Sequence, residues 1–365
     1  MSARTTIARL QFKTLHIPFK VAFRHASAER SETLSVWVRA ESSEGLVGHG
    51  ESCPRSYVTG ETIESAQTFF DRHEADVRAS VRDRADLDAW IASHVTEIDA
   101  DPAAWCAIEL AVLDLLGKTV NQPVEVVIAR PRLEGRFHYS AVLGDATAEV
   151  FRATSERYLA LGFRDFKVKL SGDLDRDRGK LEALRTRTDI RVRGDANNLW
   201  EDAAEAIEGI AALDFPFFAI EEPIAANQHA ELVQVGEALD TRIVLDESFL
   251  RIDQLALLTG QPQRWIVNVR VSKMGGLLRS LAIVDRARSA NVGIIVGAQV
   301  GETSLLTRAA LTVAKAAGDA LVAQEGAFGT FLLERDICEP PLMFGRGGVL
   351  DSSAHERLAG AGWGL

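Results

Sequence analysis

The stretch FRDFKVKLSGDLDRDRGKLEALRTRTDIRVRGD, residues 163–195, decides the fold. Its short apolar runs, DFKVKL and IRVRGD, flank a charged segment with helical spacing. The alternation continues from about residue 136 through eight strand candidates: FHYSAV, DFKVKL, IRVRGD, FFAIEE, RIVLDE, WIVNVR, VGIIVG and ALVAQE. Such a series predicts an α/β fold closed as a (β/α)8 barrel. The alternative is an open doubly wound sheet, and the absence of GxGxxG after the first strand speaks against it.

Residues 1–130 have a different pattern. Alternating apolar positions in ETLSVWVRAES indicate half-buried antiparallel strands, and longer helical stretches follow, including PAAWCAIELAVLDLLGK with Pro102 after the candidate N-cap Asp101. We therefore expect an α+β domain at 1–130 and the barrel at 131–340. The Gly-rich segment 341–365 is expected to return to the N-terminal domain.

Composition narrows the class of protein. The 365 residues are 47% hydrophobic and 25% charged, which argues against dominant disorder. A net charge of −11 disfavours non-specific nucleic-acid binding. The three cysteines form no CxxC pair and favour a reducing, cytoplasmic compartment. Neither a signal-peptide core nor a membrane-spanning apolar run is evident, so we expect no membrane association.

Charged residues recur at the predicted carboxyl ends of five consecutive strands, where barrel enzymes place their catalytic groups. They are spaced by 24 to 26 residues, which is about the length of one βα unit: Lys169, Asp195, Glu221, Asp246 and Arg270. Each carboxylate alone could cap a helix or pair with an arginine. Three carboxylates at one register instead require a counter-charge, and a hard divalent cation with oxygen ligands, Mg²⁺, supplies it.

A second lysine, Lys167, stands two residues before Lys169 on the same strand, so both side chains face one side. A lone Lys-x-Lys would be two lysines at a strand end. Beside the carboxylates, mutual repulsion is expected to leave one lysine neutral and able to act as a base. The assembled chemistry is removal of the proton α to a substrate carboxylate, with the cation stabilising the enediolate.

The ordered motifs resemble those of the enolase superfamily, and specifically its muconate-lactonizing-enzyme (muconate cycloisomerase) subgroup. The resemblance spans nearly the whole chain through KVK (167–169), DAN (195–197), EEP (221–223), DES (246–248), the pair Gly275-Gly276, and YVTGET in the N-terminal domain. It implies a modified TIM-type barrel with an N-terminal α+β capping domain. It also implies that Lys169 is the acid or base, tuned by Lys167, and that Asp195, Glu221 and Asp246 bind Mg²⁺.

The sequence departs from this family on the sixth strand, where a lysine usually faces Lys169. NVRVSKMGG places Arg270 at that position. An arginine side chain stays protonated in proteins and therefore cannot accept a proton as a general base. Two-base racemases and epimerases are therefore disfavoured, and a Mg²⁺-dependent lyase or cycloisomerase with Arg270 as electrostatic partner is favoured. The alternative is a dipeptide or N-acyl amino acid epimerase in which Lys273 reaches back from a loop.

Other residues are predicted to contact the substrate, a small carboxylate. Two loops of the N-terminal domain, 23–32 and 53–61, offer arginines for a second substrate carboxylate, although surface salt bridges would also explain them. The predicted contacts are Arg24, Arg55, Tyr57, Asn197, Gln299 and Glu325. A carboxylate-binding protein without turnover and a Schiff-base aldolase are weaker alternatives, and family members often form homo-oligomers.

Overall fold

The computed structural model describes residues 4–25 and 28–365, without the side chains of residues 21–29. Its N-terminal part contains a three-stranded antiparallel sheet in the order β1-β4-β5, with β1 at Ile7–Leu15, β4 at Ser35–Ser42 and β5 at Val47–Ser52. A separate antiparallel pair, β2 (Pro18–His25) and β3 (Ala28–Glu32), covers most of the segment predicted as a loop at 23–32. Residues 23–32, FRHASAERSE, are mostly polar and lack the apolar alternation by which strands are recognised.

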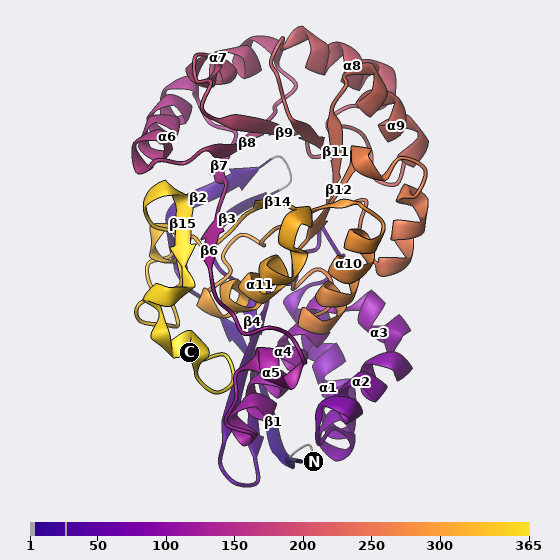
Figure 1. Cartoon of the computed structure of the whole chain (residues 1–365), viewed down its shortest axis with the longest axis vertical. Helices are drawn as coiled ribbons and strands as arrows, with labels where there is room; N and C mark the ends of the chain where they lie inside the picture. The colour runs from indigo at the N-terminus through magenta and orange to yellow at the C-terminus, as the bar shows by residue number, and fades with distance from the viewer. Residues whose placement is uncertain (1–3, 26–27) are drawn as a thin grey trace.

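Helices complete the N-terminal part (Figure 1). They are α1 (Ile63–Ser80), α2 (Arg84–Ser93), α3 (Val95–Ala100), α4 (Pro102–Thr119) and α5 (Val124–Val127). Asp101 is the N-cap residue of α4, but its side chain makes no capping hydrogen bond; Glu61 Oε1 accepts from Ala104 N instead, at 3.1 Å. The carboxylate at this helix start therefore comes from a residue far away in the sequence.

Helix α4 is buried on nearly all sides, because β4, α1 and α5 pack around it and strand β5 lies directly against it. A side chain at Gly50 would place its Cβ 1.9 Å from Ala107 O, and one at Gly48 would approach Ala111 O to 2.2 Å. Only glycine allows two backbones to come this close. The glycines of GLVGHGES are thus explained by helix–sheet packing.

The barrel predicted from the sequence is confirmed. Eight parallel strands follow one another in chain order from β7 to β14, which excludes the doubly wound alternative. They are β7 (Ala141–Leu143), β8 (Asp165–Lys169), β9 (Arg191–Asp195), β10 (Ala219–Glu221), β11 (Arg242–Leu245), β12 (Trp265–Val269), β13 (Gly293–Val296) and β14 (Leu321–Gln324). Ser140 N donates to Gln324 O at 2.7 Å and so links the two edge strands of this sheet.

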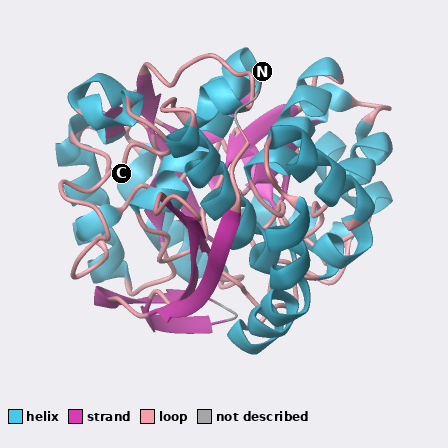
Figure 2. Cartoon of the chain, turned by 90° about the horizontal axis from the view of Figure 1, so that it is seen from below, coloured by secondary structure: helices cyan, strands magenta, loops and turns pink. Residues whose placement is uncertain are grey.

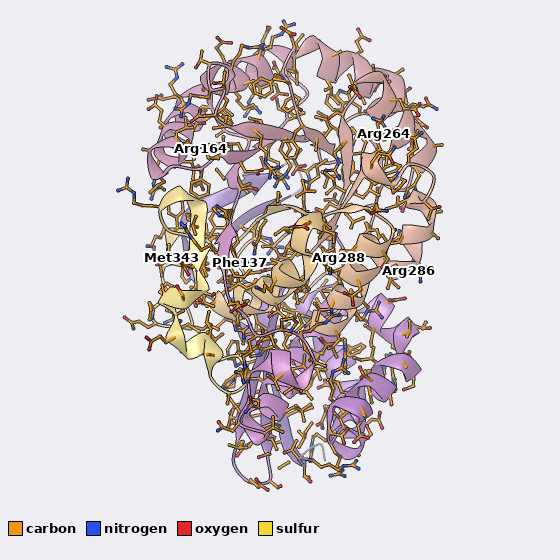
Figure 3. All side chains as sticks on the ribbon, viewed as in Figure 1. Phe137, Arg164, Arg264, Arg286, Arg288 and Met343 are labelled. Carbon is orange, nitrogen blue, oxygen red and sulfur yellow. The ribbon has the colours of Figure 1, made fainter. Side chains whose placement is uncertain are left out.

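Helices cover the outside of the strands, as Figures 1 and 2 show, and Figure 3 adds the side chains to the same ribbon. They are α6 (Ala148–Leu161), α7 (Leu174–Arg185), α8 (Ala203–Ala212), α9 (His229–Ala238), α10 (Leu277–Ser289) and α11 (Ser304–Ala317). After β11 the connection is a 3₁₀ helix, Ile252–Leu258, in place of an α-helix. Among the described residues, no helix is both long and apolar enough to cross a membrane.

The C-terminal segment runs back along the molecule. Its strand β15 (Val349–Asp351) pairs antiparallel with β6 (Arg136–His138). Trp363 is buried against α4: its backbone N–H donates to Asp114 Oδ1 at 2.8 Å, and its indole N–H donates to His49 O at 3.2 Å. Chain end and N-terminal part therefore share one core, while the domain boundaries at residues 130 and 340 stay a prediction.

Candidate active site

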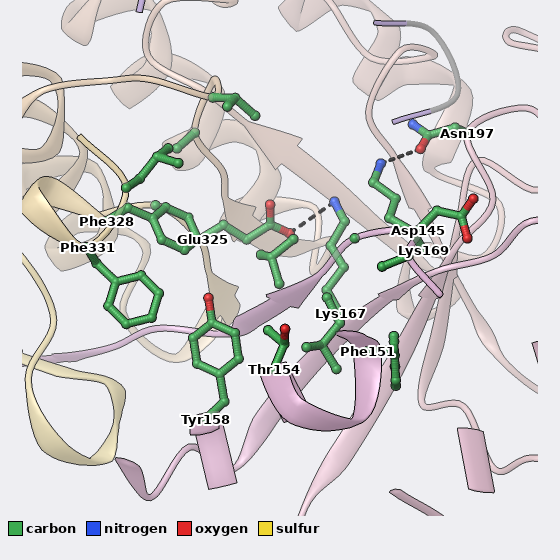
Figure 4. A pocket seen from close by; sticks show the side chains of 18 of the residues that line it. Asp145, Phe151, Thr154, Tyr158, Lys167, Lys169, Asn197, Glu325, Phe328 and Phe331 are labelled. Atoms are coloured by element: carbon green, nitrogen blue, oxygen red, sulfur yellow. Dashed lines mark hydrogen bonds and ion pairs between the residues drawn. The ribbon is translucent and has the colours of Figure 1, made fainter. Parts of the chain in front are cut away.

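A cavity of about 540 Å³ opens at the carboxyl ends of the barrel strands. Seven of the residues predicted from the sequence line it: Tyr57, Lys167, Lys169, Asn197, Arg270, Gln299 and Glu325. Figure 4 shows Lys167 in the middle of this pocket, with Lys169 and Asn197 to one side. The periodic charges of the sequence thus meet in one place because consecutive parallel strands are in register, Lys169 beside Asp195 and Asp195 beside Glu221.

Lys167 is buried among carboxylates. Its Nζ lies 2.8 Å from Asp195 Oδ2, 2.9 Å from Glu221 Oε1 and 3.3 Å from Glu325 Oε1. Burial opposes its charge, but the three carboxylates outweigh burial and raise the pKa of Lys167 above its ordinary value. This pairing favours the charged form of Lys167, whereas the Lys-x-Lys spacing predicts that one of the two lysines is neutral.

Lys169 projects from the same strand into the cavity. Its Nζ lies 2.7 Å from Asp195 Oδ2 and also contacts the side-chain oxygen of Asn197. Asn197 reaches it because this residue adopts a left-handed backbone conformation, with φ of 49°, at the end of β9. Asparagine tolerates that conformation better than most residues do. The DAN motif thus supplies both partners of the Lys169 ammonium group.

The three predicted metal ligands are all buried, and each approaches a protein cation. Asp246 Oδ1 lies 2.8 Å from Lys273 Nζ, and its Oδ2 pairs with Arg270. Glu221 has the least compensated charge. Burial raises its pKa to about 7 against the opposing charge of Lys167, and its Oε2 accepts no hydrogen bond.

The three carboxylates are suitable ligands for a hard divalent cation, but in this structure they form ion pairs with lysine and arginine side chains. Within residues 4–25 and 28–365, no three His, Cys, Asp or Glu side chains are arranged to hold a metal ion. The carboxylate oxygens instead form ion pairs with Lys167, Arg270 and Lys273. The set still offers oxygen-only donors from adjoining strands and a buried, unsatisfied oxygen on Glu221, which are the properties that Mg²⁺ requires.

Arg270 and Lys273 have different surroundings. Arg270 lines the cavity and donates from Nη1 to Gln299 Oε1 at 3.0 Å. Lys273 is fully buried, does not line the cavity, and donates from Nζ to the backbone oxygen of Asp246 at 2.8 Å. A turn at residues 271–275 follows Arg270, and within it Met274 N–H donates to Arg270 O at 3.0 Å. This turn carries Lys273 away from the cavity.

Arg24 and Arg55 are the two arginines predicted to hold substrate, and the structure describes the side chain of Arg55. Arg55 is buried outside the cavity lining, where its guanidinium donates to the backbone oxygens of Thr33, Leu34, Pro54 and Val300. It therefore ties the N-terminal part to the loop after β13. The side chain of Arg24, in β2, lies outside the described residues.

Sequence analysis missed two buried charged residues beside the site. Arg193 pairs with Glu325 and lies 3.0 Å from Asp165 Oδ1. Glu222 accepts from the backbone N–H groups of Asp246 and Ser248, at 2.6 and 2.7 Å, and so fixes the DES turn. A signal for Arg193 exists, because it stands two residues before Asp195 and must face the same side of β9.

Comparison with known proteins agrees with this geometry. Residues 3–128 match the family described as the mandelate racemase / muconate lactonizing enzyme N-terminal domain, and residues 150–364 match the enolase C-terminal domain-like family. The chain belongs to the mandelate racemase/muconate lactonizing enzyme family of the enolase superfamily. The predicted family, the barrel and the N-terminal capping domain are therefore confirmed. The chain is an isomerase or lyase of this superfamily.

Relatives of more than one activity match the chain. The L-Lys-D/L-Arg epimerase of Methylococcus capsulatus is 30% identical and covers 91% of this chain and 93% of its own. The chloromuconate cycloisomerase of Cupriavidus pinatubonensis is 25% identical and covers 85% and 84%. Epimerases and racemases outnumber cycloisomerases among these relatives. These relatives favour the epimerases, the class that sequence analysis gives as the alternative to a lyase or cycloisomerase.

Two solved structures complete the comparison. The muconate lactonizing enzyme of Pseudomonas fluorescens, complexed with muconolactone, superposes with a TM-score of 0.86 at 24% identity and covers 99% of this chain and 96% of its own. That likeness shows the fold. The dipeptide epimerase of Methylococcus capsulatus, complexed with Mg and the dipeptide L-Arg-D-Lys, has a TM-score of 0.78 at 28% identity and covers 91% and 93%.

Proposed function

We propose that this enzyme removes the proton α to a substrate carboxylate, with Lys169 as the single base, in a cycloisomerisation or a syn elimination. One observation carries the proposal. The cavity is lined by Lys169 from β8 and by Arg270 from the end of β12, four strands away in the eight-stranded sheet and therefore on the opposite side. A base on one side and a permanent cation on the other suit one-base chemistry.

The chain's own residues have distinct tasks in this proposal. Asp195 and Asn197 hold the Lys169 Nζ toward the cavity. Lys167 stays charged between its carboxylates and attracts the substrate carboxylate. Burial opposes the charge of Arg270, but Asp246 and Glu247 outweigh it and raise the pKa of Arg270, so this side chain remains a cation that stabilises developing negative charge.

We further propose that Asp195, Glu221 and Asp246 hold Mg²⁺. When bound, the cation makes the α-proton more acidic by stabilising negative charge on the substrate carboxylate. For the three carboxylates to reach it, Lys167, Arg270 and Lys273 must give up part of their present ion pairs. The Oε2 of Glu221 needs the smallest change, because it accepts no hydrogen bond and its ion-pair partner, Arg193 Nε, is 3.9 Å away.

Solvent deuterium exchange tests the base. A set of carboxylates is incubated with Mg²⁺ in D₂O, and α-deuteration is followed by mass spectrometry. We expect exchange with the unaltered enzyme and its loss in Lys169→Ala, while Lys315→Ala, which removes a half-exposed lysine of α11, leaves it unchanged. Exchange that persists in Lys169→Ala contradicts the proposal. Binding without exchange of any substrate would favour the carboxylate-binding alternative.

Epimerisation is the second candidate, because seven of the eight relatives compared are epimerases or racemases. It requires deprotonation of both enantiomers, for which Lys273 would have to leave Asp246 and enter the cavity. The test compares α-deuteration of an L- and a D-enantiomer in separate reactions. Exchange of one enantiomer supports the one-base proposal. Exchange of both, lost for one of them in Lys273→Ala, supports the epimerase.

A further inference from the structure

One side of the cavity is walled by apolar side chains that take no part in the proposed proton transfer. Thr154 and Tyr158 come from α6, and Phe328, Phe331 and Leu332 come from the segment after β14. We call this group the α6 chamber. Figure 4 shows Tyr158, Phe328 and Phe331 gathered on one side of the pocket, with Lys169 and Asn197 on the other and Lys167 between them.

The aromatic walls are held by further rings behind them. The Tyr158 and Phe331 rings are stacked at 5.7 Å between centroids. Phe344 packs against both Phe328, at 5.6 Å, and Phe331, at 5.4 Å. Tyr158 also meets Phe163 edge-on, at 5.0 Å. Walls supported in this way keep their shape without a ligand, and a pre-formed pocket binds with less loss of conformational entropy.

Charge around the α6 chamber disfavours a cationic guest. The nearest carboxylates are already paired: Asp145 lies 3.1 Å from Lys180 Nζ and 3.0 Å from Arg176, and Glu325 is held by Lys167 and Arg193. Glu247, which also lines the cavity, follows β11, four strands from β7 and thus on the far side.

The chamber's polar atoms also point to an uncharged guest. The Thr154 hydroxyl is satisfied by the Val150 carbonyl at 2.8 Å. The exposed Arg157 places its guanidinium 4.0 Å from the centre of the Phe331 ring, so a cation–π contact already engages this charge. The buried Tyr158 hydroxyl makes no hydrogen bond to another described residue, so it can donate to one uncharged oxygen of a ligand.

We propose that the α6 chamber binds an uncharged apolar group of the substrate, about the size of one aromatic ring. The enzyme then acts on carboxylates with apolar tails and rejects those with ammonium or carboxylate tails. The inference rests on the proposed function for the position of the reacting carboxylate, beside Lys167 and Lys169. The tail extends from there across the cavity to Phe331.

Binding measurements separate this inference from the reaction itself. Isothermal titration calorimetry with Mg²⁺ in the buffer compares 4-phenylbutanoate, 6-aminohexanoate and octanedioate, whose tails are aromatic, cationic and anionic. We expect 4-phenylbutanoate to bind at least about tenfold more tightly than the other two, because only its tail gains by leaving water. Equal or tighter binding of either charged-tail compound overturns the inference.

A substitution that fills the α6 chamber locates the binding. Thr154→Trp should weaken 4-phenylbutanoate binding by about tenfold or more, because the new ring occupies the guest's space. The matched control is Ala153→Trp, which adds the same ring to the solvent-exposed face of α6. Unchanged affinity in a folded Thr154→Trp, checked by circular dichroism, overturns the inference; if that variant does not fold, the three-probe comparison decides alone.

The two proposals fail in different ways. α-Deuteration of 4-phenylbutanoate and longer apolar carboxylates is followed in parallel with the titrations. Tight, Thr154-dependent binding without any α-deuteration supports the α6 chamber and contradicts proton abstraction. Deuteration that favours cationic tails supports proton abstraction and contradicts the chamber.

Discussion

The two sides of the cavity are built on different physical principles. The charged side, from Lys167 to Arg270, takes its groups from the ends of consecutive strands, and each group is balanced by opposite charges. The α6 chamber is lined by residues of α6 and of the segment after β14, which are far apart in the sequence. Its aromatic side chains are held by packing against one another. Reactivity depends on register and charge balance, whereas selectivity depends on shape. The two should therefore respond differently to substitution.

The largest effect is expected from breaking the charge balance beneath the site. Arg193→Met removes a fully buried cation from Glu325 and Asp165, which keep only Lys167 and Arg191 as partners, and removing one member of such a buried ion pair costs about 3 kcal/mol of unfolding free energy. The matched control is Arg191→Met on the same strand, whose half-exposed side chain should cost less than about 1 kcal/mol. Chemical denaturation measures both. Similar losses would show that charge balance in the barrel interior is not special.

The next effect concerns the carboxylate with the least compensation. Glu221→Gln should weaken Mg²⁺ binding, measured by calorimetry without substrate, by about 100-fold or more, because a charged ligand is lost while the shape is kept. The control is Glu237→Gln on the exposed part of α9. Equal Mg²⁺ affinity in Glu221→Gln and the unaltered enzyme would remove Glu221 from the proposed metal site.

A smaller effect is expected from exchanging one cation for another. Arg270→Lys keeps a positive charge but loses the paired contacts to Asp246 and Gln299, so the one-base reaction should slow by about tenfold. The new lysine can also lose its proton. Exchange of the second enantiomer, absent before the substitution, is then expected in D₂O, and its continued absence would mean that position 270 does not face the substrate α-carbon.

The smallest effect is expected inside the α6 chamber. Tyr158→Phe keeps the stacked ring and removes a hydroxyl that has no hydrogen-bond partner among the described residues, so 4-phenylbutanoate affinity should stay within about twofold and stability should not fall. Thermal unfolding and calorimetry measure the two quantities. A large loss of affinity would show that selectivity on this side depends on a hydrogen bond and not on shape alone.

Sequence analysis predicted that the charged residues at the strand ends meet, and it did not predict the apolar side of the cavity. Lys169, Asp195 and Glu221 recur with the length of a βα unit, so their meeting follows from the barrel itself. Tyr158 and Phe331 have no common spacing, and only packing brings them together. For Arg55 the sequence predicted a substrate contact that the structure does not show. An arginine in a loop is expected to be accessible, but the Arg55 guanidinium donates to backbone carbonyl oxygens.

Trp363 has a consequence for how the chain is made. Its indole is buried against α4, and its main-chain N–H holds the buried carboxylate of Asp114. The ribosome delivers α4 some 250 residues before this tryptophan, because the two bonded residues are 249 positions apart. The N-terminal domain, although translated first, cannot complete its core until translation has passed residue 363. During synthesis it must wait with one apolar face uncovered, a state in which newly made chains are open to chaperones and aggregation.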